Sequence, residues 1–102
     1  MIPLNYYMEK NSMQKITLDA QYLLEKEIAH EYLKEKLELP YYYGKNLDAL
    51  YDCLTEFVDV EICIDTSHVD ELQKENSTYY HKIMRVFQAA ARENIELKVI
   101  FF

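Results

Sequence analysis

The sequence predicts a single α/β domain of two layers, in which about four helices pack on a three-stranded parallel sheet. Three short segments of alternating apolar and polar residues are separated by two pairs of helical segments. Strands that are joined through helices pair in parallel, with right-handed crossovers. A chain of 102 residues supports one domain, and one glycine and two prolines favour long regular elements over a many-stranded barrel. Because apolar and polar residues alternate along each predicted strand, we expect helices to cover one face of the sheet and water to reach part of the other.

The N-terminal part of the chain divides into an extension and the start of the domain. Residues 1–13 show no periodicity and are expected to form an extension that precedes a domain of residues 14–102. The first strand is expected at residues 15–19 and the first helix at residues 22–37. This helix ends before Pro40, because the residue preceding a proline avoids helical geometry. Its apolar stripe is expected to consist of Leu24, Ile28, Tyr32 and Leu33.

A second helix is expected at residues 45–57, with Asn46 as its N-cap and Gly44 permitting the tight backbone before it. Helical spacing divides this segment into two faces. The apolar face, which explains its folding, comprises Leu47, Leu50, Cys53, Leu54 and Phe57. The opposite face is acidic and comprises Asp48, Tyr51, Asp52, Thr55 and Glu56.

The remaining elements are a second strand at residues 58–65, helices at residues 68–74 and 79–93, and a last strand at residues 96–102. The longer of these helices places Ile83, Val86, Phe87 and Ala90 at i, i+3, i+4 and i+7. Short hydroxyl side chains precede both helices and can cap them: Thr66 or Ser67 for the third, and Ser77 or Thr78 for the fourth.

Charge is distributed unevenly along the chain. The net charge is −7, yet residues 46–73 contain eight acidic side chains and neither Lys nor Arg. All of the excess negative charge therefore lies in the middle of the sequence. Such a region repels phosphate backbones and attracts basic proteins, which argues against direct binding to nucleic acid. Solubility alone remains an alternative explanation for the acidic face of the second helix.

Other functional classes find less support in the residues. An acid–base pair of Asp48 and Asp52 would need a cleft that a chain of 102 residues has little material to build. His30, His68 and His81 match no zinc spacing, so we expect no metal or other cofactor. Cys53 and Cys63 lie in apolar patterns and are expected to be buried, reduced thiols of a cytoplasmic protein. We expect neither a membrane span nor a signal peptide, because no apolar run approaches 18 residues and the first seven residues lack basic and apolar blocks.

Tyrosine is unusually frequent, with ten residues in the chain. Tyr41, Tyr42 and Tyr43 are consecutive in a loop, so they cannot all point into a core. Exposed tyrosines beside acidic residues are typical of protein–protein interfaces, since a rigid aromatic ring contributes contact area at low entropic cost.

Residues 42–55 closely resemble the central segment of the barstar family, the intracellular inhibitors of the secreted ribonuclease barnase. Residues 37–40, Val86-Phe87 and the last strand also look similar, so the resemblance covers about residues 14–102. It implies a small α/β domain whose second helix and preceding loop fill the active site of a ribonuclease. It also implies a protein without catalytic activity or cofactor, which acts on a basic extracellular-type ribonuclease or nuclease toxin, as an immunity protein does, and is a monomer when free.

The resemblance assigns individual roles by position. Asp52 would be the main anchor and would occupy the place of a substrate phosphate, Asp48 would pair with a basic residue at the rim, and Tyr42 would pack against the catalytic histidine of the enzyme. The residues expected to border the contact are Gly44, Asn46, Tyr51, Thr55 and Glu93.

The sequence departs from the family at four positions, one of them among these residues. Tyr51 replaces a tryptophan, Ala89 replaces a contacting glutamate, Lys45 replaces an acidic residue and Glu56 replaces a glycine. The departures leave the identity of the target nuclease open. A barstar-like adaptor domain that binds another basic protein is therefore the alternative function.

Overall fold

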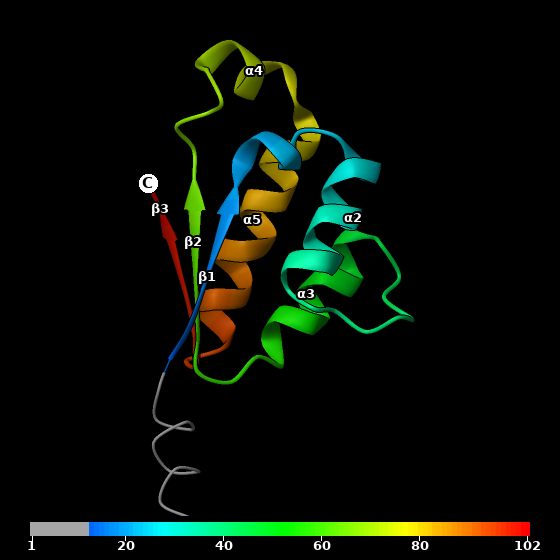
Figure 1. Ribbon diagram of the computed structural model, residues 1–102, viewed down its shortest axis with the longest axis vertical. Coiled ribbons are helices and arrows are strands. Elements are labelled where there is room, and N and C mark those ends of the chain that lie inside the picture. Colours follow the sequence, from blue (N-terminus) through cyan, green and yellow to red (C-terminus); the bar gives the residue numbers. More distant parts are fainter. Residues whose placement is uncertain (1–12) are drawn as a thin grey trace, which may run out of the picture.

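The computed structural model describes residues 13–102, so the expected extension lies outside the described residues apart from Met13. Three strands and five helical segments follow one another along the chain (Figure 1). Their bounds are β1 Gln14–Asp19, the 3₁₀ turn η1 Ala20–Leu23, α2 Lys26–Lys36, α3 Leu47–Thr55, β2 Val60–Asp65, α4 Glu71–Asn76, α5 Thr78–Glu93 and β3 Leu97–Phe101.

The three strands form one parallel sheet in the order β1-β2-β3, which confirms the predicted fold class. Val60 at the start of β2 pairs with Gln14 of β1 and with Leu97 of β3, so all three strands begin at the same end of the sheet. The helices α2, α3 and α5 lie on one side of this sheet, and α3 packs against α5 (Figure 1). The helix α3 therefore lies farther from the strands than α5 does.

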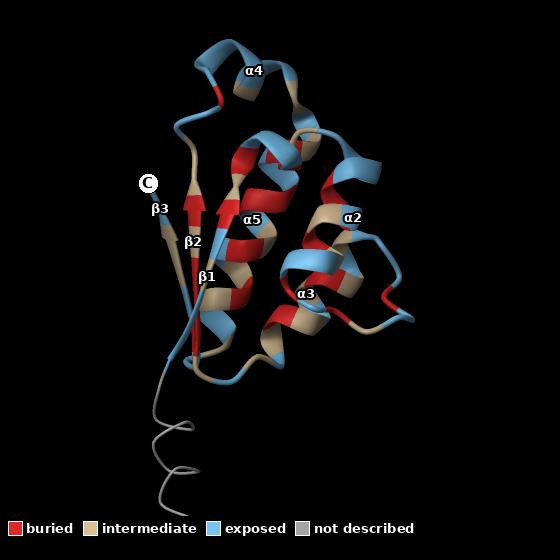
Figure 2. Ribbon diagram, viewed as in Figure 1, coloured by how far each residue is buried: buried red, intermediate tan, exposed pale blue. Residues whose placement is uncertain are grey.

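The core lies between the sheet and the helices, where the buried segments of each element face one another (Figure 2). Side chains with no exposed surface come from the strands β1 and β2 and from the helices α3 and α5: Leu18, Ile62, Ile64, Leu50, Leu54, Ile83 and Phe87. Burial of each such side chain contributes about 1.5–3 kcal/mol of transfer free energy. The apolar face predicted for α3 and α5 is thus the face that holds them in place.

The opposite face of the sheet carries polar residues. Glu61 on the central strand, 9% exposed, lies between Lys15 and Lys98 of the neighbouring strands, with both N–O distances 3.8 Å. Cys63 points to the same face because it is two residues further along β2. Both cysteines are free but only partly buried, so the prediction of buried thiols is wrong in degree.

The first helical region differs from its prediction. A 3₁₀ turn and a separate helix, α2, replace the single helix expected from residue 22. The apolar stripe is also rotated, because α2 turns Ala29, His30 and Leu33 into the core and leaves Ile28 51% exposed. Tyr32 instead lies at the edge of the core and accepts a hydrogen bond from the backbone N–H of Asp19 at 2.7 Å.

The caps of the later helices were only partly predicted. Ser77 caps α5 by accepting a hydrogen bond from the N–H of Tyr80, as predicted. The helix α4 begins three residues later than expected and is capped by Asp70 in a capping box with Gln73. Thr66 is not the cap of α4, which begins at Glu71, and its hydroxyl instead donates to the carbonyl of Phe102 at 2.8 Å.

The turn before α3 places its left-handed residue one position later than expected. Lys45 has φ 52°, whereas the φ of Gly44 is not positive. A Cβ at Gly44 would lie 3.3 Å from the side-chain nitrogen of Asn46 and 3.4 Å from the Cβ of Ala49. Gly44 therefore serves close packing against the N-terminus of α3 rather than an unusual backbone conformation.

Candidate protein-interaction site

The helix α3 is held at its start by Asn46, as predicted. The side-chain oxygen of Asn46 accepts a hydrogen bond from the N–H of Ala49 at 2.8 Å, and its amide donates to the carbonyl of Gly44 at 3.2 Å. Such a cap contributes about 1 kcal/mol to helix stability. Leu50 and Leu54 pack into the core, and the helix consequently presents its opposite face outward.

This outward face carries the carboxylates of Asp48, Asp52 and Glu56, which we call the acidic face. All three residues are exposed. Within residues 13–102, none of the ion pairs involves a carboxylate of the acidic face. Like charges one helical turn apart destabilise a helix by about 0.2–0.5 kcal/mol per pair, so the acidic face opposes folding.

The base nearest to α3 in the sequence is Lys45, and it is engaged elsewhere. Its ammonium group forms an ion pair with Glu31 on α2. The hydrogen bond and the charge of Lys45 lower the pKa of Glu31 below its usual value. The positive charge of Lys45 is therefore directed toward α2 and does not neutralise the acidic face.

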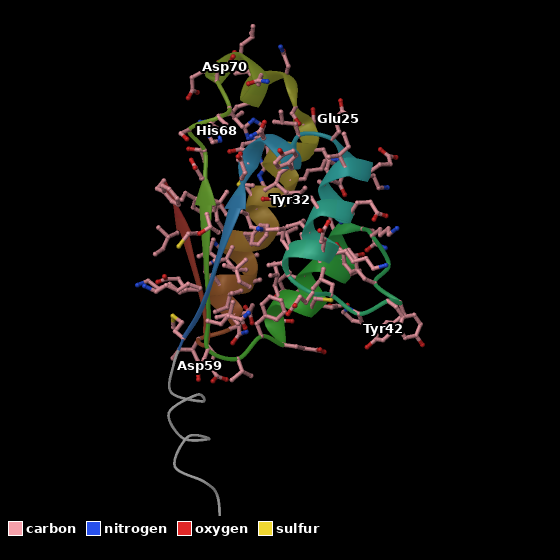
Figure 3. The ribbon with its side chains drawn as sticks, viewed as in Figure 1. Glu25, Tyr32, Tyr42, Asp59, His68 and Asp70 are labelled. Carbon is pink, nitrogen blue, oxygen red and sulfur yellow. The ribbon has the colours of Figure 1, made fainter. Side chains whose placement is uncertain are left out.

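The loop of residues 40–46, which we call the tyrosine loop, leads into α3. Tyr41 and Tyr42 are exposed, Tyr42 by 74%, and their rings meet edge to face with centroids 5.4 Å apart. Figure 3 shows Tyr42 at the tip of this loop, pointing away from the body of the protein. Tyr43 points the other way, into the core, where its hydroxyl lies 2.6 Å from Nδ1 of His30. The three tyrosines thus divide as predicted.

The tyrosine loop and α3 enclose a shallow hollow of about 250 Å³. Its lining combines an exposed aromatic ring with two carboxylates, from residues Pro40, Tyr42, Tyr43, Gly44, Ala49, Asp52, Cys53 and Glu56. The structure therefore brings together Tyr42, Gly44 and Asp52, as the sequence predicted. Glu56 was not among the predicted site residues, although its i, i+4 spacing from Asp52 could have indicated it.

Two of the predicted border residues are less free to reach a partner. The hydroxyl of Thr55 donates to the carbonyl of Asp52 at 2.9 Å, within α3 itself. The ring of Tyr51 is half-buried and packs against the core. Asp48 lies on the same helix one turn before Asp52, at the edge of a second hollow that it shares with Lys26, Asn46, Leu47 and Tyr79.

Glu93 comes from a different element, as the last residue of α5, and is exposed. The next residue, Asn94, joins the ends of the two helices. Its side-chain amide donates to the carbonyls of Leu54 at 3.1 Å and Phe57 at 2.8 Å. Glu93 is thereby held near the C-terminal end of α3, while Ala89, one turn earlier, offers no charge.

The histidines and the acids elsewhere do not assemble a metal site in the described part of the chain. No three His, Cys, Asp or Glu side chains gather there in an arrangement suited to a cation. His68 instead pairs with Asp19, with Nδ1 and Oδ2 2.7 Å apart. The hydrogen bond and charge of Asp19 raise the pKa of His68.

Among the helices of residues 13–102, none has the length and apolar content needed to cross a bilayer.

A rigid helix that presents uncompensated carboxylates beside exposed tyrosines defines a protein-binding domain of the small α/β class, suited to a basic partner.

Comparison with known proteins identifies the family of the chain. It belongs to the family described as Barstar (barnase inhibitor), which matches residues 13–102. The chain is also 37% identical over 89 residues to a protein of Bacillus subtilis (strain 168) named "Putative ribonuclease inhibitor YrdF". That match covers 86% of this chain and 98% of the relative. Family and relative together indicate an inhibitor rather than an enzyme, and the acid–base alternative for Asp48 and Asp52 is thereby set aside.

Proposed function

We propose that this protein inhibits a ribonuclease of the barnase type, or a related nuclease toxin, by filling its active site with α3 and the tyrosine loop. The observation that carries the proposal is the acidic face, which is exposed, opposes folding and has no cation partner within residues 13–102. A surface that costs stability is explained when a binding partner compensates for it.

The chemistry of such a partner fits this surface. The active site of a ribonuclease is a basic pocket that binds a phosphate group, and a carboxylate on a helix is a fixed anion of similar charge. The carboxylate of Asp52 would occupy the phosphate position, and Asp48 would pair with a basic residue at the rim. Tyr42 would cover the catalytic histidine from the tip of the tyrosine loop. A basic side chain and a carboxylate form strong, charge-assisted hydrogen bonds once water is excluded.

The surrounding residues have more limited roles in this proposal. Gly44 and Asn46 keep the tyrosine loop close to α3. Tyr51 and Thr55 would border the contact through the parts of their side chains that remain exposed, and Glu93 would add an anion at the end of α5. Without a charge at Ala89, this part of the surface attracts a basic partner less strongly.

The conditions under which the inhibitor would act follow from the whole chain. Two free cysteines suit a reducing compartment, so we place its action in the cytoplasm. A net charge of −7 accelerates encounter with a basic nuclease and keeps free molecules apart, which favours a monomer before binding.

A titration of RNA cleavage tests the proposal. Small basic ribonucleases of the barnase type, together with any nuclease encoded beside this gene, are mixed with increasing amounts of the protein. Cleavage is expected to stop at a molar ratio of one to one. The proposal fails if every one of these nucleases keeps its activity at excess inhibitor. Recovery of a basic partner that is not a nuclease, with binding unaffected by Asp52→Ala, would favour the adaptor alternative.

A further inference from the structure

A buried histidine connects the tyrosine loop to the rest of the fold. His30 on α2 is 1% exposed, and both of its ring nitrogens meet tyrosine hydroxyls. Nδ1 lies 2.6 Å from the hydroxyl of Tyr43 in the tyrosine loop, and Nε2 lies 2.5 Å from the hydroxyl of Tyr79 on α5. The three side chains form one hydrogen-bond chain that crosses three separate parts of the molecule.

The two hydrogen bonds of this chain depend on each other. Burial is the main cause that lowers the pKa of His30, and the ring is therefore neutral at neutral pH. A neutral imidazole has one N–H donor and one acceptor nitrogen. One tyrosine must consequently donate to the ring while the other accepts from it. The hydroxyl of Tyr79 thus helps to select the tautomer of His30 that Tyr43 meets.

Tyr43 is the point at which the tyrosine loop is anchored. It is the one buried residue among residues 41–46, as Figure 2 shows for the loop that leads into α3. Its backbone N–H donates to the carbonyl of Pro40 at 2.9 Å, and its hydroxyl is held by His30. The other side-chain link from the loop to α2 is the exposed ion pair of Lys45 and Glu31. Exposed ion pairs stabilise a conformation only weakly, so the buried link dominates.

Fixing Tyr43 also fixes its neighbour. Tyr42 directly precedes Tyr43, within the turn that is closed by the hydrogen bond from the N–H of Tyr43 to the carbonyl of Pro40. Anchoring Tyr43 in the core therefore limits the directions in which the exposed ring of Tyr42 can point. A side chain that is already ordered before binding loses less conformational entropy in the complex. The position of Tyr42 therefore depends on a hydroxyl that lies on α5, some distance away in the sequence.

We propose that the chain Tyr79–His30–Tyr43 positions the tyrosine loop for binding, and that Tyr79 is a positioning residue of the inhibitor. This inference rests on the proposed function for its consequence in binding, whereas its consequence for the order of the loop concerns the free protein alone. Tyr79 acts through His30 and Tyr43, and its hydroxyl is directed at the imidazole rather than at a partner.

The experiment compares two variants that each lose one hydroxyl. Tyr79→Phe breaks the chain, and Tyr32→Phe is the matched control. The control hydroxyl also joins α2 to another element, because it accepts from the N–H of Asp19 on β1, and this hydrogen bond does not involve the tyrosine loop. Tyr79→Phe is expected to raise the dissociation rate of the nuclease complex about two- to tenfold, which corresponds to one more side chain ordered on binding. The association rate is expected to stay constant, since no charge changes.

A second measurement uses the free protein. In the wild type, ¹⁵N chemical shifts of His30 are expected to show one tautomer, and amide relaxation of residues 41–46 is expected to show an ordered loop. Tyr79→Phe should give a mixture of tautomers and a more mobile loop, while Tyr32→Phe should resemble the wild type. Unchanged relaxation of residues 41–46 in Tyr79→Phe would overturn the inference, whatever the nuclease assays show. Equal dissociation rates of the two variants, in a complex that does form, would also overturn it.

Discussion

Replacement of Asp52 by alanine separates binding from folding most clearly. The carboxylate of Asp52 is exposed on α3, its side chain takes part in none of the ion pairs of residues 13–102, and it lines the hollow beside Tyr42. In the complex it would be enclosed among basic groups. Its removal then leaves those groups buried and uncompensated, which costs about 3–5 kcal/mol. The dissociation constant is expected to rise by about two to four powers of ten.

The same substitution should stabilise the free protein. Alanine is a better helix former than aspartate by up to about 0.7 kcal/mol. The change also relieves the repulsion of Asp52 by Asp48 and Glu56, about 0.2–0.5 kcal/mol per pair. A gain of about 1 kcal/mol raises the melting temperature of a domain of this size by about 4–8 °C. Binding and stability should therefore change in opposite directions.

The assay measures inhibition of the nuclease and thermal unfolding for Asp52→Ala and two controls. Asp52→Asn keeps the shape of the side chain and removes its charge, so it should weaken binding to a similar extent. Glu75→Ala removes an exposed acid from α4, at the other end of the molecule from α3 (Figure 1), and should leave binding nearly unchanged. A melting temperature that falls markedly in Asp52→Ala would place this residue in a structural role. Equal affinities of Asp52→Ala and Glu75→Ala would refute its role as the anchor.

The remaining predictions concern salt, pH and the end of α3. The association rate of the complex should fall about tenfold or more between low and high ionic strength, because salt screens the acidic face, and stopped-flow mixing would measure it; a constant rate would contradict electrostatic steering. Burial and then the nearby charge of Lys26 lower the pKa of His30, against the opposing charge of Glu27, so the unfolded chain binds more protons in acid. The contribution of His30 to the unfolding free energy is complete above about pH 6.5 and is lost as the pH falls below that value. Urea unfolding of the wild type and of His30→Gln at several pH values would show this loss as a pH-dependent difference between their unfolding free energies. His68 has a raised pKa and contributes with the opposite sign, and the comparison with His30→Gln cancels its effect. Asn94→Ala removes both hydrogen bonds to carbonyls at the end of α3 and should lower the unfolding free energy by about 1–3 kcal/mol. The control Gln88→Ala, at an exposed position of α5, should leave the unfolding free energy unchanged, and thermal unfolding measures both variants.

Sequence patterns predicted an element correctly where all of its determinants lie within one short segment. The amphipathic spacing of residues 47–57, the cap at Asn46 and the acidic face all lie within one short segment, and the structure reproduces them. The same holds for α5, where Ile83 and Phe87 are buried as their spacing predicted. A helix with one strongly apolar face has only one way to bury it.

The predictions that failed depend on distant partners. The apolar side chains near α2 do not form a single clear stripe, and its rotation is decided by the enclosed imidazole of His30 and by Tyr32. The helix α4 begins later than expected and is capped by Asp70, whereas Thr66 hydrogen-bonds to Phe102, just beyond the end of β3. In both places a polar group found its partner in a part of the chain that sequence spacing does not bring near.

The sequence by itself determined the two-layer α/β class, the position of the acidic face and the sign of its charge, since these follow from periodicity and composition. The tertiary structure alone decided which charges stay uncompensated and what holds the tyrosine loop. Lys45 neighbours the acidic face in sequence but pairs with Glu31 across the fold. Tyr43 is anchored through His30 to Tyr79, 49 residues from that histidine. Hydrogen bonds and ion pairs require proximity in space, and only the tertiary fold brings α2 close to the tyrosine loop and to α5.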